Sequence, residues 1–253
     1  MVKTGIFYIV FTVLFTAANA QYAYTGNQLN YPKAANAFRQ KEDSLKKQFE
    51  EAGLTWPAKQ LYLRSFKYDS QMEVWVRNSS QDVFKLFKTY KICALSGALG
   101  PKRMEGDYQV PEGFYYINEL NPNSKYHLSL GINYPNAADR VNSESINPGG
   151  EIFIHGSCAT IGCIPIQNDQ VEELYVLSAY AQERGQQFIP VHIFPVRFNN
   201  EKSMQALQKV IQGNPGYQLL VNGFKEAFDY FEANRKLPLI SVTKKGQYAI
   251  LSR

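Results

Sequence analysis

The sequence predicts an α+β fold in which a β-rich sandwich or barrel core carries flanking helices. Short segments of alternating apolar and polar residues, rich in Tyr, Phe, Val and Trp, recur between residues 59 and 156. Loops that contain Pro, Gly and Asn separate these segments. A helical spacing of apolar residues occurs before this region and again after it. These patterns together predict one β core with helices added on either side of it in the chain.

Residues 1–20 have the three-part pattern of a cleaved secretory signal peptide. A basic start at Lys3 precedes an apolar run over residues 6–15, and small residues at 18–20 end the segment. The apolar run is shorter than the roughly 20 residues that a spanning helix needs, although an uncleaved N-terminal anchor is an alternative. We expect an exported protein of the periplasm or cell envelope. Its mature chain would start at Gln21 and have no stable membrane span.

The next expected element is an N-terminal helical segment, residues 21–53. Within it, residues 32–53 are highly charged and end at a glycine, with apolar side chains at Phe38, Leu45 and Phe49. This spacing is typical of an amphipathic helix. We expect one face of this helix to pack on the rest of the protein and the other to face solvent.

Residues 54–253 are expected to form a second unit, which includes the C-terminal helices. Its two tryptophans, Trp56 and Trp75, are expected in the core. Strands are expected within residues 59–78, 84–97, 112–120, 126–134, 150–156 and 188–198, helices at about 168–185, 200–212 and 216–234, and a final β hairpin at 237–251.

The composition excludes a disordered chain and argues against nucleic-acid binding. Hydrophobic residues make up 45% of the sequence and aromatic residues 14%, which is ample material for a core. The net charge of +5 is scattered, without a stripe of Lys and Arg. We therefore expect no nucleic-acid partner, while a mild attraction to polyanionic cell-wall or membrane surfaces fits the charge.

One stretch, "IFIHGSCATIGCIPI" at residues 152–166, places His155, Cys158 and Cys163 within nine positions. The third cysteine of the chain is Cys93. An odd number of cysteines in an exported protein leaves at least one thiol free or paired with another molecule. The stretch is therefore the main candidate for chemistry.

Three explanations of this cluster involve no catalysis. A structural zinc site usually shows two closely spaced ligand pairs, and the sequence has no second pair nearby. A disulfide between Cys158 and Cys163 is possible across a turn, and an oxidising compartment favours it. A buried, unreactive thiol is the remaining explanation.

A catalytic explanation needs a thiolate, a base within hydrogen-bond reach and donors for an oxyanion. The segment "EIFIH" is a strand that delivers His155 at its end, and the chain then turns through Gly156 and Gly162 to Cys163. Glycine before the thiol allows backbone amides to turn toward a substrate carbonyl. A helix that begins near Asn168 would favour a thiolate if the side chain pointed at its N-terminus.

The motif "IHGSCATIGC" resembles the signature of the YkuD-type L,D-transpeptidase catalytic domain family, in its short-spaced YafK-like branch. That signature pairs His-Gly with a downstream Ser/Thr-x-Gly-Cys, which are residues 155–156 and 160–163 here. Three further segments resemble the same branch, so that the resemblance covers about residue 54 to the C-terminus. These segments are "GPKRMEGDYQVPEGFYYI" (100–117), "INYPNAADR" (132–140) and "IPVHIFPVRF" (189–198).

The resemblance implies a YkuD-like core and an L,D-transpeptidase-like catalytic domain at 54–253. It implies that Cys163 is the nucleophile, that His155 is the general base, and that Cys158 is not the nucleophile. Gly162 and Gly156 would supply backbone for the oxyanion. We expect no cofactor and no metal.

The implied substrate is the tetrapeptide stem of peptidoglycan. A thioester on the nucleophile would pass to an acceptor amine in transpeptidation, or to water in a carboxypeptidase or amidase reaction. The sequence does not distinguish these two outcomes. It also allows a substrate in which peptidoglycan is linked to a protein. A non-catalytic wall-binding module is the alternative of a different class.

Stem peptides carry carboxylates, so cationic contacts are expected near the nucleophile. Lys102 and Arg103 are candidates, together with Tyr134. The other two histidines, His127 and His192, lie in alternating segments and are expected to be structural.

Overall fold

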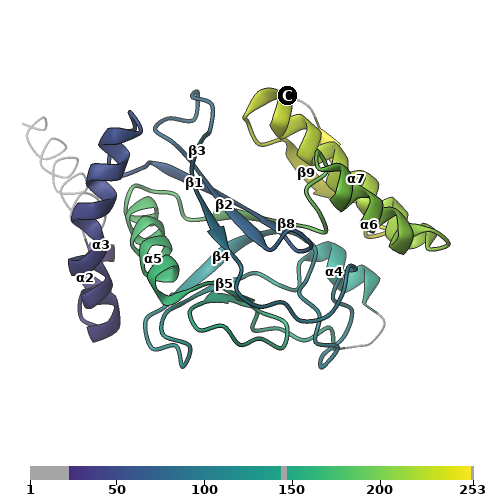
Figure 1. The fold of residues 1–253 in the computed structure, drawn as a ribbon, viewed down its shortest axis with the longest axis horizontal. Helices are drawn as coiled ribbons and strands as arrows, with labels where there is room; N and C mark the ends of the chain where they lie inside the picture. The colour runs from purple at the N-terminus through teal and green to yellow at the C-terminus, as the bar shows by residue number, and fades with distance from the viewer. Residues whose placement is uncertain (1–22, 144–146, 252–253) are drawn as a thin grey trace, which may run out of the picture.

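A mixed eight-stranded sheet lies at the centre of the computed structural model, which describes residues 23–143 and 147–251 (Figure 1). The signal peptide expected at residues 1–20 lies outside the described residues. The strands follow one another across the sheet in the order β3-β2-β1-β8-β4-β5-β6-β7. Their bounds are β1 Gln60–Phe66, β2 Gln71–Arg77, β3 Lys85–Lys91, β4 Gly113–Asn121, β5 Ser129–Ile132, β6 Phe153–His155, β7 Ile164–Pro165 and β8 Ile189–Phe194.

Most neighbouring strands are antiparallel, and two pairs are parallel. β1 runs parallel to β8, and β6 runs parallel to β7, while the remaining pairs are antiparallel. The central strands β1 and β8 are buried almost along their whole length, because helices cover both faces of the sheet there.

The two edges of the sheet curl toward each other. Ile92, directly after β3, forms an antiparallel bridge with Ile166, directly after β7. The backbone N–H of Cys93 also donates to the carbonyl oxygen of Pro165 at 3.1 Å. The sheet is therefore a half-barrel, which confirms the expected α+β class with a barrel-like core.

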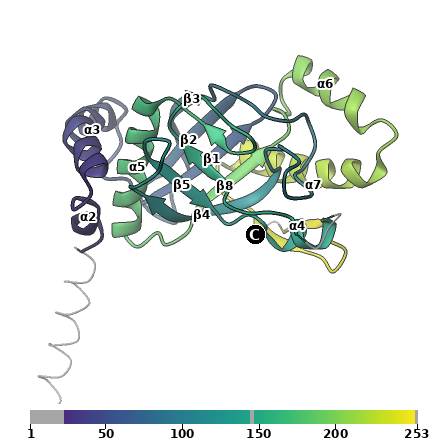
Figure 2. The same cartoon turned by 90° about the horizontal axis from the view of Figure 1, so that it is seen from below.

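Helices cover the sheet on two sides (Figures 1 and 2). On one side α5 lies between the sheet and α3, and α2 continues the outer layer. On the other side α6 and α7 pack on Phe66 and Phe194 of the sheet. The helices are α2 Ala23–Gln28, α3 Pro32–Glu51, α4 Ala137–Asn142, α5 Asn168–Glu183, α6 Glu201–Ile211 and α7 Pro215–Asn234, and a hairpin of β9 Leu239–Val242 and β10 Tyr248–Leu251 follows them.

The sequences of α3 and α5 explain their places in these layers. In α3 only one stripe of side chains, which includes Phe38, Leu45 and Phe49, is buried. The stretch of α5 from Val171 to Ala179 is buried throughout, because the helix has protein on both sides. The amphipathic helix predicted at 32–53 is thus confirmed, and its apolar stripe packs on α5.

The other predicted elements are also present, with a few additions. Each strand and helix expected after residue 54 overlaps a strand or helix of the structure, and Trp75 is buried as expected, while Trp56 is half-buried against the core. The sequence did not predict α4, a helix of six residues that begins with a capping box between Asn136 and Asp139. Within the described residues, no helix has the length and apolar character needed to span a membrane.

Candidate active site

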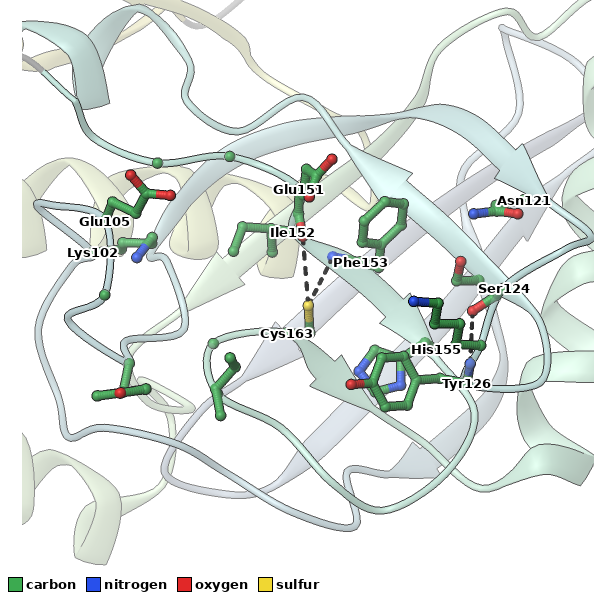
Figure 3. A pocket seen from close by; sticks show the side chains of 18 of the residues that line it. Lys102, Glu105, Asn121, Ser124, Tyr126, Glu151, Ile152, Phe153, His155 and Cys163 are labelled. Atoms are coloured by element: carbon green, nitrogen blue, oxygen red, sulfur yellow. Dashed lines mark hydrogen bonds between the residues drawn. The ribbon is translucent and has the colours of Figure 1, made fainter.

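A cavity of about 530 Å³ brings together the two ends of the His-Cys motif. His155, Gly162 and Cys163 all line it. The opposite walls come from the 102–108 loop and from the turn at residues 121–126 between β4 and β5 (Figure 3).

Pairing of β6 with β7 places Cys163 in this cavity. The parallel register sets Ile154 beside Ile164, so that Cys163, one residue earlier, lies beside Phe153. The backbone N–H of Phe153 donates to Sγ of Cys163 at 3.4 Å. The thiol in turn donates to the carbonyl oxygen of Glu151 at 3.7 Å.

His155 ends β6 and is only 2% exposed. Its Nδ1 lies 2.5 Å from the carbonyl oxygen of Gly156. Because a carbonyl oxygen can only accept a hydrogen bond, Nδ1 carries the proton and Nε2 holds a lone pair. The ring of Tyr126 packs against the imidazole with 4.8 Å between centroids. This tautomer suits a general base.

The thiol and the imidazole line the same cavity. Among the contacts of the described residues, there is no hydrogen bond between the two groups. In Figure 3 the Cys163 side chain points toward Glu151 and Phe153, and His155 lies to one side. Catalytic hydrogen bonds are often absent or long before substrate binds. A proton transfer from this thiol to His155 would first require the Cys163 side chain to turn away from the Glu151 carbonyl.

The hydroxyl of Thr160 fixes the turn that carries Cys163. It accepts a hydrogen bond from the Gly162 N–H at 3.0 Å and donates to the Cys163 carbonyl at 2.8 Å. Gly162 has a φ of 144°, and a Cβ atom there would lie 3.2 Å from the Gln109 carbonyl oxygen. Glycine is therefore required on both conformational and steric grounds.

Gly156 is also sterically required, in a different setting. A Cβ atom on it would lie 2.5 Å from Oδ1 of Asn168 and 3.0 Å from the Tyr126 carbonyl oxygen. Its N–H donates to the Leu128 carbonyl at 3.1 Å. The N–H groups of both expected oxyanion residues, Gly156 and Gly162, thus have hydrogen-bond partners in the resting structure.

Cys158 is bonded to Cys93, with 5.4 Å between their Cα atoms. The expected alternative of a disulfide between Cys158 and Cys163 is therefore wrong. The curl of the sheet brings Cys93 to the 156–163 loop, where it pairs with Cys158. Cys163 lies in the cavity as a free thiol. In residues 23–143 and 147–251, no three His, Cys, Asp or Glu side chains are grouped to hold a metal ion.

Burial dominates the electrostatics of the pair. It lowers the pKa of His155 below its usual value, so the imidazole is neutral at pH 7. Burial also raises the pKa of the Cys163 thiol, against the opposing effects of the Phe153 N–H and the charge of Lys102. The groups that favour a thiolate here are thus the Phe153 N–H and the Lys102 ammonium.

The three expected substrate contacts differ in position. Lys102 lines the cavity and is 6% exposed, with its ammonium donating to Asp107 at 2.6 Å. Tyr134 is buried outside the cavity lining, and its hydroxyl donates to the Pro148 carbonyl at 2.9 Å. Arg103 also lies outside the lining, and its backbone N–H donates to Asp107.

The other two histidines lie outside the cavity lining. His127 bonds to Glu172 at 2.7 Å, and buried His192 bonds to the hydroxyl of Tyr62 at 2.7 Å. Both are thus satisfied structural residues, as predicted. The place of Tyr126 in the site was not predicted from the sequence, because the register of β5 with β6 brings its turn to His155.

Comparison with known proteins places this chain in a family. Residues 66–193 match the YkuD family, described as the L,D-transpeptidase catalytic domain. Two relatives, both named "Putative L,D-transpeptidase YafK", come from Escherichia coli K12 and Escherichia coli O157:H7. Each is 34% identical over 192 residues, which are 75% of this chain and 73% of that protein.

Solved structures show weaker similarity. A mutant of the helical cell shape determining protein Pgp2 from Campylobacter jejuni aligns with a TM-score of 0.44 and 18% identity, over 76% of this chain and 89% of that one. Bd1075 from Bdellovibrio bacteriovorus aligns with a TM-score of 0.38 and 20% identity, over 70% of this chain and 64% of that one. On the sequence matches, this chain belongs to the YkuD family of L,D-transpeptidase catalytic domains.

Proposed function

We propose that this protein is an exported cysteine acyltransferase that acts on peptidoglycan stem peptides, with Cys163 as nucleophile and His155 as general base. The observation that carries the proposal is that a free thiol and a buried, neutral imidazole line one cavity from the paired ends of β6 and β7. Membership of the family supports the reaction class.

The first half of the proposed reaction forms a thioester. The Cys163 side chain rotates from the Glu151 carbonyl toward Nε2 of His155, which takes the thiol proton. The thiolate attacks the amide carbonyl of the stem peptide, forming a C–S bond. His155 then gives its proton to the leaving amine as the C–N bond breaks. The Gly156 carbonyl holds the Nδ1 proton throughout.

The second half transfers the acyl group. An acceptor amine attacks the thioester carbonyl, and His155 takes a proton from that amine. A new C–N amide bond forms as the C–S bond breaks, and His155 returns the proton to the Cys163 thiolate. If water attacks in place of the amine, the product is a carboxylate, and the enzyme is a carboxypeptidase or amidase. A peptidoglycan–protein link would be cut by the same route.

The tetrahedral intermediates need a donor for their oxyanion. The N–H of Gly162 can serve if it leaves the Thr160 hydroxyl, a side-chain partner that can rotate away. The N–H of Gly156 is bonded within the sheet region to Leu128 and is the poorer candidate. Lys102, whose charge lowers the pKa of the thiol, would stabilise negative charge at the sulfur.

In this proposal Arg103 and Tyr134 stabilise the loops beside the cavity. Each contacts a loop beside the cavity, through Asp107 and Pro148 respectively. The bond between Cys93 and Cys158 supports export, since disulfides persist in oxidising compartments such as the periplasm.

Product analysis with a disaccharide-tetrapeptide tests this function. The protein is incubated with the substrate, and the products of the wild type and Cys163→Ala are compared by mass spectrometry. Cross-linked dimers that require Cys163 would support a transpeptidase, whereas tripeptide without dimers would identify the hydrolase. The same absence of product from the wild type and from Cys163→Ala, on both free and protein-linked stems, would contradict the proposal.

A further inference from the structure

The N-terminal helix α3 lies outside the family match at 66–193, yet it contacts the wall of the cavity. Its apolar side chains pack on α5, which anchors the helix to the domain. From this position two lysines of α3 act on the β4–β5 turn at residues 121–127. Lys33 contacts the turn itself, and Lys41 contacts Glu172 of α5, which holds the turn.

Lys33 contacts the turn directly. Its ammonium donates to the carbonyl oxygen of Ser124 at 2.7 Å. The hydroxyl of Ser124 accepts the N–H of Tyr126 at 3.1 Å, a contact drawn in Figure 3. One lysine of α3 thus fixes the residue that sets the backbone direction of Tyr126.

Lys41 acts on the same turn through the first turns of α5. It forms ion pairs with Asp169 and, at 3.4 Å, with Glu172, and its side chain is only 14% exposed. Glu172 holds the ring of His127 at 2.7 Å. His127 has a φ of 73°, a conformation that costs free energy for a residue other than glycine, so this turn needs contacts that hold it.

The turn held in this way forms one wall around the His155 imidazole. The Tyr126 ring lies 4.8 Å from the imidazole, centroid to centroid, with 34° between the planes. The Tyr126 carbonyl oxygen also limits the space at Gly156, whose own carbonyl holds Nδ1 of His155. A displaced turn would therefore loosen the imidazole on two sides.

We propose that α3 is a positioning element of the active site, in which Lys33 and Lys41 hold the 121–127 turn so that Tyr126 keeps His155 aligned for proton transfer. The inference rests on the proposed role of His155. Lys33 and Lys41, which lie outside the matched catalytic domain and do not line the cavity, would then be necessary for full turnover.

Steady-state kinetics of Lys33→Met and Lys41→Met test the proposal. We expect kcat to fall about tenfold in each, with KM nearly unchanged, because misalignment of a catalytic group slows chemistry more than binding. Lys33→Arg should restore most of the loss. Lys47→Met is the matched control, since Lys47 lies on the same helix with its side chain 76% exposed.

A double-mutant cycle shows whether the lysine acts through the aromatic ring. Tyr126→Leu alone should lower kcat, and adding Lys33→Met should lower it little further, because both changes release the same group. Multiplicative losses would overturn the proposal. So would wild-type kcat in both Lys33→Met and Lys41→Met.

Hydrogen exchange gives a readout that is independent of activity. Lys33→Met should speed exchange in peptides covering residues 121–128 while leaving the other strands unchanged. Unchanged exchange there would contradict the inference even if the wild type proved inactive on every substrate. A wild type without turnover, but with faster exchange in the variant, would leave the structural coupling intact and refute only the proposed function.

Discussion

The Cys163 sulfur accepts a hydrogen bond from the backbone N–H of Phe153 at 3.4 Å. This contact fixes the thiol to β6 two residues before His155. Alternate residues of a strand face the same side, so Phe153 and His155 both face the cavity that Cys163 lines. The pairing of Cys163 with β6 therefore places the thiol on the same side of the sheet as the imidazole, and both side chains line one cavity.

The state of the cysteines gives the first prediction. A thiol reagent should modify one cysteine per native molecule and three after reduction and unfolding, because Cys93 and Cys158 are paired. The bond joins residues 65 positions apart, so reduction should lower the free energy of unfolding by about 4 kcal/mol. Thermal melts with and without reductant measure this loss, with the double variant Cys93→Ser/Cys158→Ser as control. Equal melting temperatures would refute it.

The resting protonation state of the pair predicts a particular pH dependence. Burial lowers the pKa of His155, so kcat/KM should hold as pH falls to the usual histidine range and be lost only below about 6.5, where the base becomes protonated. Burial raises the pKa of Cys163, so alkylation by iodoacetamide should still accelerate above pH 9. A plateau in alkylation near pH 7 would indicate a preformed thiolate–imidazolium pair and contradict this description.

Thr160 should be needed for turnover and not for folding. Replacing it with Val keeps the size of the side chain but removes the hydroxyl that donates to the Cys163 carbonyl, and this bond holds the turn of the nucleophile even when the Gly162 N–H is released. We expect kcat to fall about tenfold or more and the melting temperature to change by only a few degrees. Thr160→Ser, which keeps the hydroxyl, is the matched variant and should retain most activity. Equal activity of Val and Ser at this position would exclude the role.

A buried carboxyl in α4, that of Asp139, should make the free energy of unfolding depend on pH in the acid range. Burial raises the pKa of Asp139 to about 6, even though Tyr115 and Asn136 donate hydrogen bonds to it. The folded state therefore binds the proton more tightly than the unfolded state, and this group destabilises the fold as pH rises from about 4 to about 6.

Asp139→Asn removes that titration and keeps an acceptor for both donors. Relative to wild type, the variant should gain stability between pH 4 and pH 6, by an amount on the order of 3 kcal/mol. Urea unfolding of both proteins at several pH values gives the difference. A constant difference from pH 4 to pH 7 would be inconsistent with the raised pKa.

Much of the fold was predictable because its patterns are local. The run of apolar and aromatic residues in β1 and the apolar spacing of α3 each depend on near neighbours in the chain, and both elements occur where the sequence predicts them. The helix α4 was missed because its six residues are too few for a periodic pattern. Its start depends on a capping box, which is a side-chain contact.

The site was predictable only in part, because its walls meet through the curl of the sheet. His155 and Cys163 are near in sequence, and the structure keeps them in one cavity. The partner of Cys158 was not predictable, because Cys93 approaches it only where β3 and β7 converge. The place of Tyr126 beside His155 likewise depends on strand register, which the sequence pattern does not define.

The most direct test of the account is the mass of the protein after brief incubation with a tetrapeptide stem, with its disulfide left intact. The proposal predicts an adduct equal to the acyl fragment, mapped to Cys163 by peptide sequencing. The adduct should be absent from Cys163→Ala and form slowly in His155→Ala. An adduct on another residue, or one that forms at the wild-type rate without His155, would contradict the roles proposed for Cys163 and His155.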